Sequence, residues 1–182
     1  MAEDTQAGPL VDGGTPAGPD DLFRRLDELG LGVHTIEHPP VVTVDQAKQL
    51  RGHLEGGHTK NLFLRDKRGR MWLVVCLEDT AVDLKTLQQR LESGRLSFGS
   101  ADRLSRYLGV VPGAVTPFAA MNDTTGAVRV VLDRRMMDTH AALCFHPLTN
   151  AMTTTIGAAD LVTFLEAVDH PPATIDVAPE AG

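Results

Sequence analysis

The chain has 182 residues, a formal net charge of −7, 4% aromatic residues and two cysteines. This length suits one domain with a sizeable core. We find neither a run of ~20 apolar residues for a membrane span nor a secretory signal. We therefore expect a cytoplasmic protein, and the small number of cysteines favours the same compartment. Without the acidic residues of segments 1–21 and 169–182, 16 acidic residues stand against 17 basic ones, and this near-neutral body leaves an RNA-binding face possible but not required.

The two ends of the chain differ from its body. Residues 1–19 are rich in Gly, Pro, Ala and Asp and have almost no apolar periodicity. That composition predicts a disordered leader, and residues 171–182, which look similar, are predicted to be a flexible tail. The segment between them, residues 20–170, is predicted to form a single domain.

Helical and strand patterns are interspersed along the body. The predicted elements are a helix over 20–30, a strand over 33–37, a helix capped by Thr43 that carries Val44, Ala47 and Leu50, strands over 60–65 and 71–77 joined as a hairpin, helices over 83–91 and 100–109, strands over 128–132, 141–145 and 153–156, and a helix over 158–168. The order lacks a regular βαβ rhythm, so it predicts a mixed α+β fold.

The first candidate site element is the pair Lys60-Asn61, which follows two glycines and opens the first strand of the hairpin. A lysine at the mouth of a strand can hold a phosphate as a flexible point charge, and an amide can donate to a carbonyl or ribose oxygen. The ordinary alternative is an exposed strand lysine, since most lysines are exposed.

The second element is the loop Gly113-Ala114-Val115-Thr116-Pro117. Glycine allows a ligand to approach the backbone closely, and proline fixes φ and stiffens the loop. Backbone groups here could orient an ester carbonyl or an attacking water. Because Gly/Pro loops are common, a plain turn between a helix and a strand is the alternative.

The third element is His146, which follows the predicted strand 141–145 and precedes Pro147, with Asn150 in the same loop. A histidine has a pKa near neutral pH, so it could act as a general base or as a wall that limits the size of a bound side chain. A core histidine with satisfied hydrogen bonds is the alternative.

Other chemistries find little support. His34 and His38 are four residues apart, but their segment is predicted to be extended, so they need not share a face. No Cys-x-x-Cys or His-Glu-x-x-His pattern occurs, and we therefore expect no metal. Cys76 and Cys144 lie in apolar runs, where thiols are usually inert. Any hydrolysis by this chain must therefore lack a standard nucleophile.

Basic residues form two groups that could contact phosphates, although a solvated surface is an equal alternative. One group lies in the predicted hairpin, and the other flanks the segment 97–100. The groups are Arg65, Lys67, Arg68 and Arg70 in the hairpin, and Arg90, Arg95, Arg103 and Arg106 beyond it.

Together, the Lys60-Asn61 pair, the Gly113-to-Pro117 loop and the segment Phe145-His146-Pro147 with Asn150 and Thr153-Thr154 resemble the YbaK/ProX family of free-standing prolyl-tRNA editing proteins. The resemblance covers residues 22–168. The His-Pro-x-x-Asn pattern is similar to the alanine-specific group, which deacylates mischarged Ala-tRNA(Pro).

The resemblance implies a mixed, barrel-like β-sheet flanked by helices, with a pocket between the sheet and the Gly/Pro loop. It implies hydrolysis of the alanyl ester at the acceptor end of tRNA(Pro), helped by the substrate's own 2′-hydroxyl and without a cofactor or metal. Prolyl-tRNA synthetase is a second candidate partner, and DNA is not expected to bind. The implied catalytic residues are Lys60, Gly113 and Pro117, and the implied substrate-binding residues are Asn61, Ala114, Val115, Thr116, His146 and Asn150. Arg95 matches a basic position that the family uses toward tRNA, and we expect its neighbours Arg103 and Arg106 to contact tRNA with it.

Two alternatives remain open at this point. A Cys-tRNA(Pro) deacylase would use the same chemistry, and a hydrophobic pocket separates such small side chains by only about 1–3 kcal/mol. A non-catalytic module that binds tRNA or a synthetase would keep the pocket shape without turnover, which the missing nucleophile and metal make a fair competitor.

Overall fold

The structure is a computed structural model that describes residues 7–40, 45, 49 and 54–181. The described residues form a mixed sheet of eight strands. The strands are β1 (Val33–Glu37), β2 (Gly57–Arg65), β3 (Met71–Leu77), β4 (Ser97–Phe98), β5 (Val128–Asp133), β6 (Ala142–Phe145), β7 (Met152–Gly157) and β8 (Ala173–Ile175). Their order is β1-β7-β6-β2-β3-β5-β8, with β4 paired to β2.

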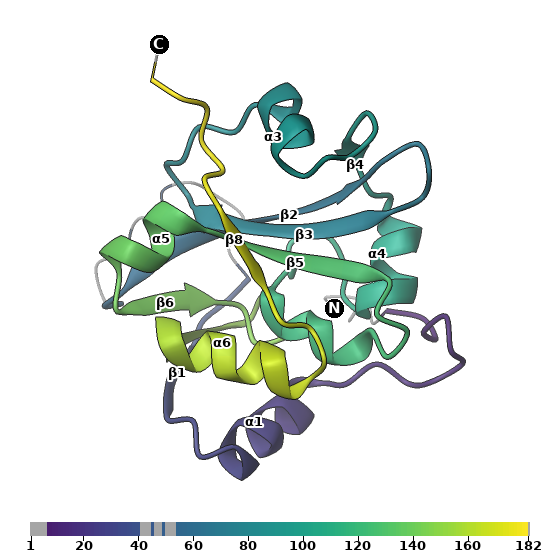
Figure 1. The fold of residues 1–182 in the computed structure, drawn as a ribbon. Helices are drawn as coiled ribbons and strands as arrows, with labels where there is room; N and C mark the ends of the chain where they lie inside the picture. Colours follow the sequence, from purple (N-terminus) through teal and green to yellow (C-terminus); the bar gives the residue numbers. More distant parts are fainter. Residues whose placement is uncertain (1–6, 41–44, 46–48, 50–53, 182) are drawn as a thin grey trace.

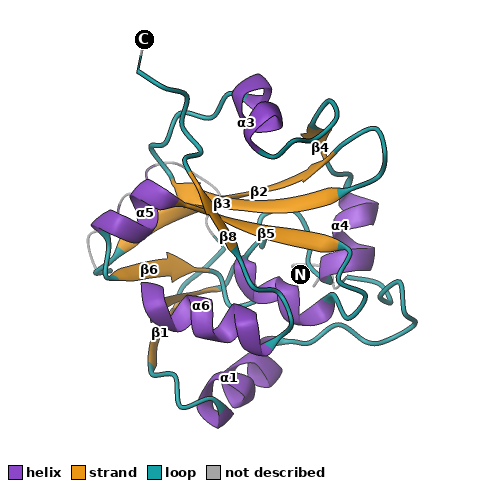
Figure 2. Ribbon diagram, viewed as in Figure 1, coloured by secondary structure: helices purple, strands orange, loops and turns teal. Residues whose placement is uncertain are grey.

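Helices lie on both sides of this sheet, as Figures 1 and 2 show, with α1 and α6 below it in that view and α3 above it. The helices are α1 (Pro19–Glu28), α3 (Leu84–Arg90), α4 (Ala101–Leu108), α5 (Arg134–Thr139), α6 (Ala158–Ala167) and the 3-10 helix η1 (Pro117–Asn122). The predicted α+β class with a mixed sheet flanked by helices is confirmed. Because no pairing joins β1 to β8 among the described strands, closure into a barrel stays a prediction.

Strand β2 organises the part of the sheet that matters for the site. It pairs along most of its length with β3 in the predicted antiparallel hairpin. On its other edge it pairs with β6 only at Gly57 and His58, and with β4 only at Leu64 and Arg65. Within the described part of the chain, residues 59–63 of β2 therefore have an edge that no strand occupies, and Lys60 and Asn61 lie in this open stretch.

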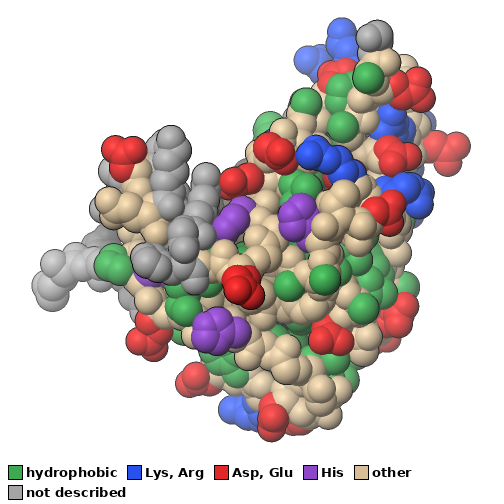
Figure 3. All heavy atoms as spheres, turned by 90° about the vertical axis from the view of Figure 1, so that its left-hand side faces the viewer, with side chains coloured by type: hydrophobic (Ala, Val, Ile, Leu, Met, Phe, Trp, Pro, Cys, Tyr) green, Lys and Arg blue, Asp and Glu red, His purple; other side chains and the backbone are tan. Residues whose placement is uncertain are grey.

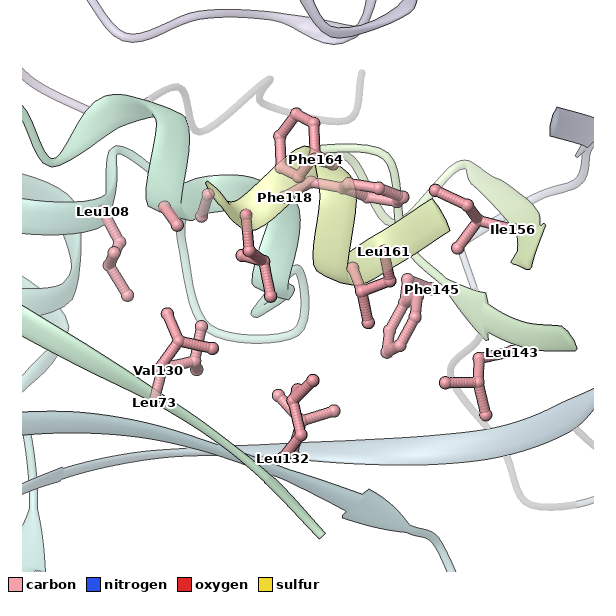
Figure 4. Close-up of a cluster of buried hydrophobic side chains, with 14 of the residues drawn as sticks. Leu73, Leu108, Phe118, Val130, Leu132, Leu143, Phe145, Ile156, Leu161 and Phe164 are labelled. Atoms are coloured by element: carbon pink, nitrogen blue, oxygen red, sulfur yellow. The ribbon is translucent and has the colours of Figure 1, made fainter. Parts of the chain in front are cut away.

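The main hydrophobic core fills the space between the sheet and the helices α6 and η1. Figure 4 shows side chains from both layers pointing toward one another. The fully buried ring of Phe118 lies edge-on against Phe145 at 5.8 Å and against Phe164 at 5.4 Å between ring centroids. Such edge-to-face pairs add to the burial of the rings themselves, and they fix η1 and the loop before it against the sheet.

A smaller core covers the opposite face of β2 and β3. Alternate side chains of the hairpin, including Leu64, Trp72 and Val74, pack there against Leu87 of α3 and Leu96. Both faces of β3 are thus buried, which explains its continuous apolar sequence.

Both chain ends differ from expectation where the structure describes them. The segment 7–18, predicted to belong to a disordered leader, lies against the body because Leu10 is buried and the N–H of Val11 donates to the carbonyl of Arg106. The predicted flexible tail is likewise wrong for residues 173–177. There β8 pairs with β5 and Val177 is buried in the smaller core.

The predicted helix with Thr43, Val44, Ala47 and Leu50 lies outside the described residues. None of the helices that the structure describes has the length and apolar character needed to cross a membrane.

Candidate functional site

Lys60 and Asn61 leave the open stretch of β2 toward opposite faces of the sheet. Lys60 lies across from Cys76 and Asn61 across from Val75. Since neighbouring residues of a strand alternate between its two faces, Lys60 points to the face of the smaller core and Asn61 to the face of the main core. The two side chains are thus adjacent in sequence but separated by the strand, so a ligand contacted by both must lie at the open edge.

The ammonium group of Lys60 is held in place. Its Nζ donates a hydrogen bond of 2.5 Å to the main-chain carbonyl of Thr80, a residue just beyond β3 that is 1% exposed. Lys60 itself is half-buried. An ammonium has three N–H donors, so one anchors the side chain and the others remain for a ligand. This geometry differs from the freely exposed strand lysine of the ordinary alternative.

Asn61 carries an unsatisfied acceptor. Its side-chain oxygen Oδ1 is buried, and no donor reaches it within the part of the chain that the structure describes. Buried polar atoms are nearly always hydrogen-bonded, and an orphan costs about 1–3 kcal/mol. A ligand hydroxyl or N–H that entered the open stretch of β2 would remove this penalty.

The Gly/Pro loop begins with a tight turn over residues 111–114. The N–H of Ala114 donates to the carbonyl of Val111 over 3.0 Å, and Gly113 has φ +93°. Proline at the second position and glycine with positive φ at the third are typical of a type II turn. Gly113 is exposed at the tip of this turn, so its backbone is accessible to a ligand.

The rest of the loop is inward-facing. The side chains of Ala114, Thr116 and Pro117 are buried, and Val115 packs against the main core. The hydroxyl of Thr116 accepts a hydrogen bond from the N–H of Phe118 and so caps η1. In this conformation these side chains hold the turn in place, and their predicted contacts with substrate stay predictions.

The loop between β6 and β7 completes the arrangement from the other side. A Cβ atom built on Gly113 would lie 3.9 Å from Nδ2 of Asn150. The structure therefore brings the tip of the Gly/Pro turn against Asn150, as expected for two parts of one pocket. Leu148, in the same loop, adopts a left-handed φ of +65° and packs against the main core.

His146 is a neutral imidazole with a defined tautomer. Its Nδ1 lies 2.9 Å from the carbonyl of Met152, which can only accept, so Nδ1 carries the proton. Burial lowers the pKa of His146 below its ordinary value, and the nearby His38 acts in the same direction, against the opposing effect of the Met152 bond. Its Nε2 therefore presents a lone pair, which has no hydrogen-bond partner among the described residues.

His38 and Thr153 support this histidine, and sequence reasoning missed the role of His38. The rings of His38 and His146 lie 6.2 Å apart between centroids. Nε2 of His38 lies 2.8 Å from the hydroxyl of Thr153, and its Nδ1 lies 2.8 Å from the carbonyl of Pro39. Figure 3 shows several histidine side chains on the face that forms the left-hand side of Figure 1.

The cysteines do not supply a nucleophile. Burial raises the pKa of the Cys76 thiol to about 11, although Lys60 partly offsets the effect, and burial also raises the pKa of Cys144. Both thiols are thus protonated at neutral pH, in agreement with the expectation that they are inert. No group of three or more His, Cys, Asp or Glu side chains that could hold a metal occurs within residues 7–40, 45, 49 and 54–181.

The predicted tRNA-binding arginines lie before the Gly/Pro turn in the chain. Arg95 is exposed just before β4, whereas Arg103 and Arg106 belong to α4. Nη1 of Arg106 lies 4.0 Å from a carboxylate oxygen of Asp102, so part of its charge is compensated. Their contacts with tRNA stay predictions.

Comparison with known proteins shows which family this chain is similar to. The model of the aminoacyl-tRNA editing domain matches residues 38–164. The prolyl-tRNA editing protein ProX of Acetoanaerobium sticklandii is 40% identical over 147 residues, which cover 80% of this chain and 89% of that protein. The prolyl-tRNA synthetase associated domain-containing protein 1 of Danio rerio is 39% identical over 165 residues, which cover 88% of this chain and 90% of that protein.

A solved structure shares the fold. The crystal structure of a candidate trans-editing enzyme for prolyl tRNA synthetase superposes with a TM-score of 0.66 at 18% sequence identity. The match covers 87% of this chain and 97% of that one, so the two share their architecture over nearly the whole length.

Proposed function

This chain belongs to the family of aminoacyl-tRNA editing domains, and we propose that it is a trans-editing enzyme that hydrolyses the ester of mischarged Ala-tRNA(Pro). The observation that carries the proposal is the buried, unpartnered Oδ1 of Asn61 in the open stretch of β2. A site that holds a desolvated acceptor without a protein donor favours a substrate that brings a donor, such as a ribose hydroxyl or an amino group.

The reaction is the addition of water to the ester carbonyl carbon. Water loses a proton, the bond between the acyl carbon and the ribose oxygen breaks, and that oxygen takes up a proton as alanine leaves. Because Cys76 and Cys144 are protonated and buried, no covalent thioester intermediate is invoked. Catalysis must then come from positioning and from hydrogen bonds to the developing charge.

Each side of the site contributes one group to this reaction. Lys60, anchored by Thr80, holds the terminal phosphate, and Asn61 accepts a hydrogen bond from the ribose or the amino group. The exposed Gly113 turn places backbone groups beside the scissile ester. The substrate's own 2′-hydroxyl assists proton transfer, since Lys60, Asn61, Gly113 and His146 offer no carboxylate or thiolate for that role.

His146 shapes the pocket for a small amino acid. Its ring is fixed by the Met152 carbonyl and flanked by His38, so it forms a rigid wall rather than a mobile side chain. The free lone pair on Nε2 accepts a hydrogen bond from the substrate's amino group or from the attacking water. We infer alanine as the preferred side chain, with the acceptor end of tRNA(Pro) as the partner and prolyl-tRNA synthetase as a second partner in the cytoplasm.

The proposal is tested by incubating the purified protein with tRNA(Pro) charged with alanine, cysteine or serine and measuring the release of each amino acid. We expect alanine to be released fastest and well above its spontaneous rate. Faster release of cysteine would replace alanine by cysteine as the substrate. Binding of charged tRNA without any release would favour the non-catalytic module instead.

Substitution of the lysine locates the chemistry. Lys60→Ala should abolish most deacylation, whereas Lys85→Ala, which removes an exposed lysine from α3, should leave it unchanged. Turnover of Lys60→Ala close to that of the wild-type protein at saturating tRNA would remove Lys60 from the mechanism.

A further inference from the structure

Phe98 is an exposed aromatic side chain in a protein that has few aromatics. It is 62% exposed, and within the described residues Val11 is the only other large hydrophobic side chain that is exposed. A single exposed apolar residue is ordinary. Phe98, however, belongs to strand β4, whose pairing to β2 fixes it in place, so its ring is presented to solvent by a rigid element.

The ring lies on the same face of the sheet as Lys60. Phe98 is the cross-strand partner of Leu64, and directly opposite residues of an antiparallel pair share a face. Leu64 is four residues beyond Lys60 on β2 and also shares its face, since the side-chain period of a strand is two. At about 3.3 Å per residue, Phe98 stands about 13 Å from Lys60 along the strand.

Basic residues lie in the segments next to Phe98. Arg65 lies across from Ser97, and the adjacent hairpin turn is tied to the β4 side by a hydrogen bond from the N–H of Gly94 to the carboxylate of Asp66. The cations in the segments next to Phe98 are Lys67 and Arg68 of the hairpin turn and Arg95 directly before β4, none of which forms an ion pair within the part of the chain that the structure describes. The nearby acid Asp66 is buried and is already paired with Arg70.

We propose that Phe98 is a stacking platform for an unpaired base near the 3′ end of an RNA, with the surrounding cations contacting its phosphates. This inference rests on the proposed function, because the esterified nucleotide must lie at Lys60. Proteins that bind single-stranded nucleic acids combine aromatic platforms with a positively charged track. A separation of about 13 Å corresponds to a few nucleotides at ~3.4 Å per stacked step, which an unpaired acceptor end can span.

Charge favours RNA over a protein as the occupant of this surface. Arginine and aromatic residues are common in protein interfaces, but lysine and like charges without partners are not. Lys67, Arg68 and Arg95, in the segments next to Phe98, have no ion-pair partner among the described residues, and phosphates are the groups complementary to such charges.

The test compares the binding of two RNA probes by fluorescence anisotropy. One is an acceptor-stem minihelix with an unpaired 3′ end, and the other is the same duplex without its unpaired nucleotides. Removing a stacking aromatic costs about 1–3 kcal/mol per base, so Phe98→Ala should weaken binding of the minihelix about 5- to 140-fold. Phe98→Trp should retain it, and the matched control Val11→Ala should behave like the wild-type protein.

Salt dependence separates stacking from phosphate contact. Phe98→Ala should keep the wild-type slope of log affinity against log salt, since the ring releases no counterions. Arg95→Ala should reduce the magnitude of that slope by about 0.7–0.9, the value of one phosphate contact. A thermal unfolding curve of Phe98→Ala that matches the wild-type protein confirms that the exposed ring is not needed for folding.

The outcomes distinguish this inference from the proposed function. Unchanged affinity of Phe98→Ala, or equal weakening with both probes, overturns the stacking platform. Unchanged RNA binding together with lost capture of a synthetase assigns the surface to a protein and overturns it as well. A wild-type protein that binds the minihelix through Phe98 but releases no amino acid overturns the proposed function and leaves the platform standing.

Discussion

The substitution Gly113→Ala tests whether the turn at residues 111–114 is part of the active site. Gly113 has φ +93°, a conformation in which an L-residue with a Cβ is strained by about 1–2 kcal/mol. The nearest atom to the new methyl group would be Nδ2 of Asn150 at 3.9 Å, which is an ordinary contact. The whole cost is therefore backbone strain, and the variant should lose about 1–2 kcal/mol of unfolding free energy in urea.

We expect backbone strain of this kind to reduce activity only when it lies at this turn. Gly113→Ala relieves its strain by moving the backbone that we propose faces the ester, so kcat/KM for Ala-tRNA(Pro) should fall about tenfold or more. Gly126→Ala is the matched control, because Gly126 has φ +67°, has no atom within 4 Å of its built Cβ and lies before β5. Equal losses of activity in both variants, or full activity in Gly113→Ala, would refute the placement of this turn beside the ester.

Three further predictions concern protonation and packing. Because burial lowers the pKa of His146, kcat/KM corrected for spontaneous hydrolysis should fall as pH drops through that lowered value. His146→Gln should flatten this dependence of kcat/KM on pH. An unchanged dependence would show that the Nε2 lone pair of His146 takes no part in the reaction. Burial alone would lower the pKa of His170, but its hydrogen bond of 2.9 Å to buried Asp123 outweighs burial and raises the pKa. Its contribution is therefore complete below about pH 6.5 and lost as pH rises through the raised value, so the stability difference between wild type and His170→Gln should shrink toward high pH in urea titrations. A difference that stays constant with pH would contradict the raised pKa. Phe118→Ala should cost about 3–5 kcal/mol of unfolding free energy, the usual range for a buried phenylalanine, and a cost below 1 kcal/mol would show that the ring contacts of η1 contribute little.

The hairpin and the helix caps followed from local sequence. The apolar run of β3 and the turn at residues 66–69 predict strands and their connection without any knowledge of the rest of the chain. Ser100 and Gly109 likewise mark the ends of α4, with the Ser100 hydroxyl accepting from the N–H of Arg103 and Gly109 in the left-handed conformation. Signals of this kind lie within a few residues of the element that they define.

The elements that sequence reasoning missed depend on distant partners. β4 and β8 are short strands that form by pairing with the edges of β2 and β5. Their own composition does not predict a strand. Leu10 and Val177 were assigned to disordered ends because the residues around them are polar or small. Each is nevertheless buried against the body, which only the tertiary structure reveals.

The sequence singled out the residues of the candidate site, whose roles stay predictions, but it did not show their geometry. Lys60, Asn61 and His146 stood out as polar residues beside apolar runs, and the positive φ of Gly113 agrees with the expected need for glycine. Strand alternation could have indicated that Lys60 and Asn61 face opposite sides. The anchoring of Lys60 by Thr80 could not have been predicted, since every residue has a main-chain carbonyl and the sequence does not show which one a side chain reaches.

The central claim is that this protein releases alanine from Ala-tRNA(Pro), and the most direct test follows that release under single-turnover conditions with enzyme in excess. The wild-type protein should release alanine much faster than spontaneous hydrolysis, and Asn61→Ala should be slowed because it removes the buried acceptor that the substrate satisfies. A wild-type rate equal to the spontaneous rate, with the charged tRNA bound and intact, would contradict the account.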